Sequence, residues 1–122
     1  MGMLKKYLIA LVAMLILPVF AGDVENAVCR GHNVLLYLYS QDCGYCKLFS
    51  KKYDKLSKMY DGQYNFFKLD AGTPYGHDLL VRYKGTYVPY VILIRNNKTH
   101  RVEPKCLLEM ACVEKELKDF RK

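Results

Sequence analysis

The sequence has no run of basic residues, no internal repeat and no low-complexity tract. Its formal net charge of +7 is spread along the chain, so charge does not predict binding to nucleic acid. The absence of repeats excludes a repeat architecture. An apolar fraction of 52% with a charged fraction of 25% is typical of a globular protein, and 122 residues without a linker predict one domain.

The only long apolar run lies at the N-terminus, where a short basic start precedes Leu8–Leu17 and a small-residue exit ends at Ala21. This order predicts a secretory signal peptide over residues 1–21 and a mature domain over residues 22–122, in the periplasm or secreted. The run is too short to favour the alternative, an uncut membrane anchor, which would be the chain's only membrane contact. No cysteine stands directly after it, so nothing indicates lipid modification.

The clearest chemical pattern is the stretch Leu35–Phe49, in which an apolar strand leads directly into two cysteines, Cys43 and Cys46, that open a helix. We call these two the CxxC pair. The N-terminus of a helix favours negative charge, so it stabilises a thiolate, the form that attacks a disulfide. We therefore predict that Cys43 is the nucleophile. The spacing lets Cys46, on the first helical turn, reach Cys43 and resolve a mixed disulfide.

The same spacing also occurs in half of a zinc site, and it can hold a purely structural disulfide. A zinc site would need a second pair of cysteines or histidines, but Cys106 and Cys112 are six residues apart and the three histidines are scattered: His32, His77 and His100. We therefore expect no metal and no other cofactor. The histidines are interpreted as surface or structural residues.

All five cysteines follow the predicted signal segment, so each would meet an oxidising compartment. Beside the CxxC pair, Cys29, Cys106 and Cys112 remain, and an odd number predicts a free thiol or a bond to another molecule. We predict no bond between Cys106 and Cys112, because they lie on different sides of one regular helix. Cys106 is expected to be a core thiol or to pair with Cys29, and Cys112 to pair with Cys29 or with another chain.

Apolar spacing predicts strands alternating with helices, the pattern of an α/β fold. The expected strands are Asn33–Ser40, Tyr64–Leu69, Tyr90–Arg95 and an edge strand at Thr99–Glu103, and the expected helices are Cys43–Tyr60, Thr73–Tyr83 and Pro104–Phe120. The first strand, its helix and the second strand should form a right-handed crossover, so these two strands should be parallel. The segment Asp23–His32 is left unassigned.

A second conspicuous feature is Val88-Pro89, directly before the strand Tyr90–Arg95. Proline cannot donate a hydrogen bond to a sheet, so it fits the point where the chain enters a strand. A cis Val88–Pro89 bond would make a tight bend, and the sequence leaves the isomer open.

The CxxC pair after an apolar strand, the helix, strand and short helix that follow, and Val88-Pro89 before another strand together resemble the thioredoxin superfamily over essentially the whole mature chain. The resemblance implies a thioredoxin-like α/β fold, with a central mixed β-sheet flanked by helices and a cis Pro89 beside the CxxC pair. It also implies that Val88 holds the extended backbone of a substrate. The dipeptide Gly44-Tyr45 is similar to that of the bacterial periplasmic disulfide isomerases.

The chain departs from these patterns at several positions. Asp42 stands where cytosolic thioredoxins usually carry tryptophan, and the chain has no tryptophan at all. Tyr37 occupies the place of the buried carboxylate that assists proton transfer in thioredoxin, so that route lacks its usual group. Val88 stands where the isomerases usually have threonine, and their N-terminal dimerisation domain has no counterpart here. The subfamily is therefore open.

We expect an exported thiol–disulfide oxidoreductase, a reductase or an isomerase, that acts on protein substrates with thiols or disulfides and is reset by a redox partner protein. Gly44, Tyr45, Val88 and Pro89 are the expected substrate-binding residues. The alternative is a non-catalytic binding or assembly module of the same fold, in which Cys43–Cys46 is a structural bond.

Overall fold

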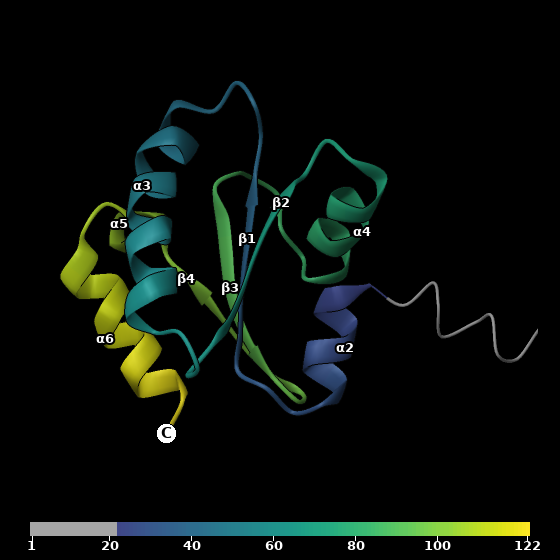
Figure 1. Ribbon diagram of the computed structural model, residues 1–122. Coiled ribbons are helices and arrows are strands. Elements are labelled where there is room, and N and C mark those ends of the chain that lie inside the picture. Colours follow the sequence, from purple (N-terminus) through teal and green to yellow (C-terminus); the bar gives the residue numbers. More distant parts are fainter. Residues whose placement is uncertain (1–21) are drawn as a thin grey trace, which may run out of the picture.

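The computed structural model describes residues 22–122, so the predicted signal peptide lies outside the described residues. The centre of the fold is a four-stranded β-sheet with the strand order β2-β1-β3-β4 (Figure 1). Its strands are β1 (Val34–Tyr39), β2 (Asn65–Asp70), β3 (Tyr90–Arg95) and β4 (Lys98–Val102). All the predicted strands are present, and none of their ends is shifted by more than one residue.

The sheet is mixed, because β1 pairs in parallel with β2 and antiparallel with β3, and β3 pairs antiparallel with β4. The parallel pair confirms the predicted crossover through α3 (Gly44–Met59). β1 and β3 take the central places because their residues are apolar on both faces, and five of the six residues of each strand are buried. β4 is an edge strand with four exposed residues out of five.

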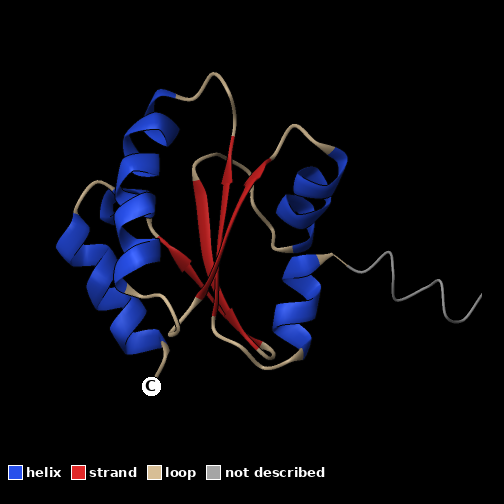
Figure 2. Cartoon of the chain, in the orientation of Figure 1, coloured by secondary structure: helices blue, strands red, loops and turns tan. Residues whose placement is uncertain are grey.

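Helices cover both faces of the sheet (Figures 1 and 2). One face is covered by α3, α5 (Pro104–Leu107) and α6 (Met110–Phe120), and the other by α2 (Asp23–Cys29) and α4 (Pro74–Arg82). The expected fold, a mixed sheet flanked by helices, is confirmed. Among the described residues, no helix is long and apolar enough to cross a membrane.

Alternation along β1 divides the buried side chains into two cores. Leu35 and Tyr37 face α3, where the ring of Phe49 meets that of Tyr37 edge-on at a centroid distance of 4.9 Å. Leu36 and Leu38 face α2 and α4. Because α3 is anchored on the sheet by buried aromatic rings, its N-terminus, which carries the CxxC pair, is held in a fixed position.

The segment left unassigned from the sequence forms the helix α2. Tyr75 of α4 holds it, because its hydroxyl donates to Glu25 Oε2 (2.6 Å) and accepts from the N–H of Val24 (3.3 Å). Arg82 Nη1 adds an ion pair with Glu25 Oε1 at 2.9 Å. These contacts join residues far apart in the sequence, so no local pattern predicts them.

The C-terminal helix is interrupted, which corrects two predictions. α5 ends at Leu107 and α6 begins at Met110, after the extended residue Glu109 (φ −121°, ψ 114°). This break brings the Cα atoms of Cys106 and Cys112 to 5.3 Å, and the two residues form a disulfide. In a continuous helix, residues six apart are separated by about 9 Å along the axis, so the bond that we excluded depends on the break.

The alternative in which Cys29 pairs with Cys106 or Cys112 is also wrong. Cys29 is exposed and unbonded among the described residues. It ends α2, whereas α5 and α6 cover the opposite face of the sheet. The sheet therefore stands between Cys29 and the other two cysteines.

Candidate functional site

Three loops meet at one end of the sheet, and they carry the predicted site residues. β1 leads into the CxxC pair at this end, which is at the top of Figure 1. Tyr90, the first residue of β3, pairs with Leu38, so Val88–Pro89 lies beside the end of β1. Val102, the last residue of β4, pairs with Val91, so the start of α5 lies at the same end. The register of the sheet therefore assembles the site.

Cys43 and Cys46 form a disulfide at the start of α3, with their Cα atoms 5.1 Å apart. Cys43 is the N-cap residue, and its Sγ accepts a hydrogen bond from the N–H of Cys46 at 3.0 Å. Cys43 is partly exposed, whereas Cys46 is only 2% exposed. A substrate can therefore reach Cys43 more readily than Cys46.

The N-terminus of α3 is the main electrostatic influence on Cys43. Its first turn contains no acidic residue, and its free N–H groups favour negative charge on the sulfur. Asp42 and Lys47 flank the CxxC pair with opposite charges, and both are exposed. Water and salt screen such exposed charges, so the N–H of Cys46, which contacts the sulfur directly, has the stronger effect.

Tyr37 supports the CxxC pair from the core. Its side chain is fully buried, and its hydroxyl donates to the carbonyl oxygen of Cys46 (2.8 Å) and lies 3.0 Å from Ser50 Oγ. The bond to Cys46 uses the only proton of the Tyr37 hydroxyl. In the contact between Tyr37 and Ser50, the Ser50 hydroxyl is therefore the donor. Burial raises the pKa of Tyr37 above its ordinary value, against a smaller lowering by the bond to Ser50. The phenol is therefore neutral at pH 7 and cannot accept a proton as a buried carboxylate would.

A shallow hollow of about 270 Å³ opens beside Cys46; its lining consists of Tyr39, Ser40, Gln41, Cys46, Lys47, Ser50 and Lys68. Lys68 Nζ lies 5.1 Å from the ring centroid of Tyr39, so this exposed lysine is held over an aromatic ring. Gln41 Nε2 donates to Asp70 Oδ2 at 3.1 Å, which fixes the loop before the CxxC pair to the end of β2. The N–H of Gly72 and, less strongly, Gln41 lower the pKa of Asp70.

An apolar groove of about 280 Å³ lies beside Pro89; its lining consists of Tyr45, Phe49, Tyr87, Val88, Pro89, Pro104, Lys105, Leu107 and Leu108. The Val88–Pro89 peptide bond is cis, as the resemblance implies. Within residues 22–122, neither the N–H nor the C=O of Val88 takes part in a backbone hydrogen bond. Both groups can therefore pair with an extended chain that lies in the groove.

The structure brings most of the predicted substrate-binding residues together. Tyr45, Val88 and Pro89 line the groove, whereas Gly44 is exposed at the start of α3 and does not line it. Sequence reasoning missed the wall formed by residues 104–108. No local signal could have revealed this wall, because its place depends on β4 returning to this end of the sheet.

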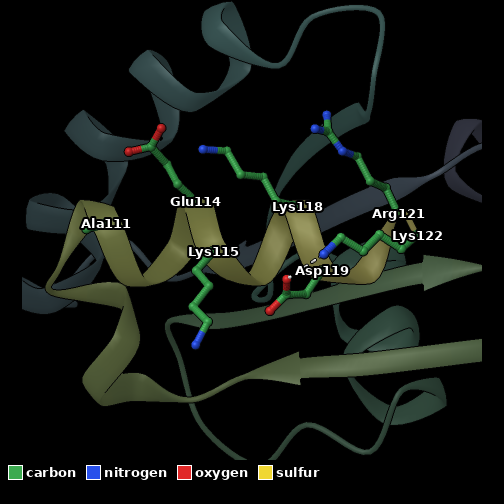
Figure 3. Close-up of a pocket in the computed structure, with 7 residues that line it drawn as sticks. All are labelled: Ala111, Glu114, Lys115, Lys118, Asp119, Arg121 and Lys122. Carbon is green, nitrogen blue, oxygen red and sulfur yellow. Dashed lines mark ion pairs between the residues drawn. The ribbon is translucent and has the colours of Figure 1, made fainter.

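A larger hollow of about 560 Å³ lies along α6 and has mostly charged lining residues: Ala111, Glu114, Lys115, Lys118, Asp119, Arg121 and Lys122 (Figure 3). Lys122 forms an ion pair with Asp119 at 3.7 Å. The lining contains no thiol or imidazole, so we interpret this surface as a solvated helix face. In the part of the chain that the structure describes, no group of three or more His, Cys, Asp or Glu residues could hold a metal ion.

Comparison with solved structures supports the fold. Thioredoxin from Fasciola hepatica is 19% identical, with a TM-score of 0.67 over 80% of this chain and 90% of that one. Deadhead, a germline-specific thioredoxin of Drosophila melanogaster, is 20% identical, with a TM-score of 0.65 over 79% and 86% of the two chains. Mitochondrial thioredoxin 3 of Saccharomyces cerevisiae is 21% identical, with a TM-score of 0.64 over 77% and 84%.

A comparison with curated proteins gives no match. The family model for thioredoxin matches residues 17–111, which is most of the chain and includes the CxxC pair and Pro89. The match agrees with the mixed sheet, with the CxxC pair at the start of α3 and with the cis Val88–Pro89 bond. The chain therefore belongs to the thioredoxin family.

Proposed function

We propose that this protein is an exported thiol–disulfide oxidoreductase that acts on protein substrates as a reductase or isomerase. The observation that carries the proposal is the unequal burial of the CxxC pair: Cys43 is partly exposed at the N-terminus of α3, and Cys46 is 2% exposed. An attacking thiol must be reachable from outside, whereas a resolving thiol needs to reach only its neighbour.

When the CxxC pair is reduced, exchange proceeds in two steps. The Cys43 thiolate attacks one sulfur of the substrate disulfide, and the other sulfur leaves with the bonding electrons and takes up a proton. Cys46 then loses its proton and attacks Cys43 Sγ, which releases the second substrate sulfur. The substrate gains two electrons and the CxxC pair becomes a disulfide, which a redox partner protein must reduce again.

The groove is the proposed binding site for the substrate chain. The free N–H and C=O of Val88 can pair with an extended segment, and the 63% exposed Tyr45 stands at the rim. Gly44, between Cys43 and Tyr45, faces open space, since a Cβ placed there would have no neighbour within 4 Å. Because backbone pairing does not depend on side chains, this arrangement suits varied protein substrates.

A second candidate is a binding or assembly module in which Cys43–Cys46 is a permanent bond. The mostly apolar groove favours it, because such a groove can hold a partner segment without any exchange chemistry. Binding alone does not need an accessible thiol backed by a buried one, so we favour the oxidoreductase.

The reduction potential of the CxxC pair decides between these candidates. We expect a value between about −120 and −270 mV, the range spanned by strong oxidants and thioredoxin-type reductants. The protein would be equilibrated in glutathione buffers, and the alkylated thiols would be counted at each cysteine by mass spectrometry, with Cys106–Cys112 as an internal reference. A value below about −300 mV would mark a bond that resists reduction and would favour the binding module.

The proposal of export rests on the pattern of residues 1–21 and agrees with two disulfides in one small domain. Expression of the whole chain in a bacterium with a periplasm should yield a periplasmic protein whose intact mass is that of residues 22–122. The variant Ala21→Arg, which alters the expected cleavage site, should stay uncut. Recovery of the unaltered chain at full length, from the cytosol or the membrane, would contradict a cleaved signal peptide.

A further inference from the structure

The second disulfide lies directly next to the groove. Cys106 stands between Lys105 and Leu107, which both line the groove, and is itself 5% exposed in the core. Its bond to Cys112 joins this segment to the first turn of α6. One wall of the groove is therefore linked covalently to a helix that packs on the sheet.

α5 cannot hold this wall by its own stability. It has four residues and no side-chain hydrogen bond at its N-cap, and a helix of this length is not stable alone. Leu108, which follows it and also lines the groove, is 48% exposed. The position of the wall depends on the burial of Cys106 and Leu107 and on the disulfide.

We propose that Cys106 and Cys112 are positioning residues for substrate binding, because their bond holds residues 104–108 where they form the apolar wall of the groove. This wall selects substrate segments that carry apolar side chains beside the reacting cysteine. Among residues 22–122, Lys105 is the one charged residue that lines the groove, so an acidic residue in the same segment strengthens binding. The inference rests on the proposed function.

The test starts from the whole chain with its disulfides formed and follows the oxidation of dithiol peptides in a single turnover. One peptide carries two cysteines flanked by leucine and glutamate, and the other has serine in place of both flanking residues. Each peptide passes two electrons and two protons to Cys43–Cys46 and becomes a disulfide. Alkylation and mass spectrometry report whether each cysteine pair is oxidised or reduced. Dithiothreitol is too small to span the groove, so its rate of reaction measures the reactivity of the CxxC pair alone.

The wild-type protein should reach half-saturation with the leucine peptide at a concentration about tenfold lower than with the serine peptide. The double variant Cys106→Ala/Cys112→Ala should lose most of this preference and react with dithiothreitol at an unchanged rate. Cys29→Ser, which removes the exposed thiol on the opposite face, is the control and should behave as the wild type does.

Full retention of the leucine preference by the double variant would overturn the inference, because the bond would then be only a structural link. Leu108→Ala changes an exposed position and does not endanger folding, so it tests the premise that this wall selects the substrate even if the double variant cannot be purified. It should also weaken the leucine preference, and an unchanged preference would overturn the inference. The same peptides, supplied as disulfides, would also be given to the protein with its CxxC pair reduced, because the potential sets the direction of exchange. A wild-type protein that exchanges with neither peptide in either direction would overturn the proposed function, and this inference with it.

Discussion

Replacing Cys46 with serine is expected to trap the protein in a mixed disulfide with its substrate. Cys43 is still exposed enough to attack, but no second thiol is left to release the product. Turnover should fall at least about a thousandfold, since an external thiol cannot match the effective concentration of a neighbour in the same chain. Serine is close to cysteine in size, so the 2% exposed position should tolerate it. The adduct would be measured by mass spectrometry without reducing agent.

The matched control is Cys43→Ser, which should form no adduct because the remaining thiol of Cys46 is buried. Both variants should be made in a Cys29→Ser background, since the exposed Cys29 could form adducts of its own. An adduct at Cys46 but none at Cys43 would reverse the assigned roles. Undiminished partner binding in both variants, with no turnover in the unaltered chain, would establish the binding module instead.

Alkaline solution is expected to destabilise the protein strongly between about pH 10 and 12. Burial raises the pKa of Tyr53 and of Tyr64 to about 12, with Asp54 adding to the effect at Tyr53. The unfolded chain ionises near pH 10, so the stabilisation is complete below pH 10 and is lost as the pH rises towards 12. Each tyrosine should lower the free energy of unfolding by about 2–3 kcal/mol over this interval, a large part of a total of about 5–15 kcal/mol. Urea titrations at each pH measure it.

Two phenylalanine variants separate ionisation from hydrogen bonding. In residues 22–122 the hydroxyl of Tyr64 donates to the carbonyl oxygen of Leu117 at 2.7 Å, whereas no such bond is seen for Tyr53. Tyr53→Phe should therefore keep the stability at pH 7 and lose less of it by pH 12. Tyr64→Phe should lose about 1 kcal/mol already at pH 7. If Tyr53→Phe follows the same pH curve as the unaltered protein, burial of this hydroxyl is not the cause.

The sequence predicted the helices and strands that are determined by residues close together in the chain. Apolar runs place β1, β2 and β3 correctly, and helical spacing places α3 and α4. Burial of a strand or of one helix face requires apolar residues at regular intervals, and these intervals are visible in the sequence. Thr73 caps α4 as expected, with its Oγ1 accepting from the N–H of Gly76 at 3.1 Å. The CxxC pair was found because its chemistry requires a fixed spacing and a helix start, and both are visible in consecutive residues.

The sequence could not predict features that depend on contacts between distant segments. α2 was left unassigned because its segment is short and polar, and the Tyr75 hydroxyl that holds it lies about 50 residues further on. The acceptor that Tyr37 found is the backbone of Cys46, whereas the sequence showed only that a carboxylate was missing. In both cases, the group that the tyrosine hydroxyl contacts depends on how the helices pack on the sheet.

By itself, then, the sequence determined the α/β order, the CxxC pair and the place of Pro89, since each follows from neighbouring residues. Only the tertiary structure decided the Cys106–Cys112 bond, the unbonded state of Cys29 and the apolar groove. No glycine or proline marks the break between α5 and α6, so the apolar stripe looked continuous. The break depends on tertiary contacts, because it lets residues 104–108 line the groove while Val113, Leu117 and Phe120 of α6 are buried in the core.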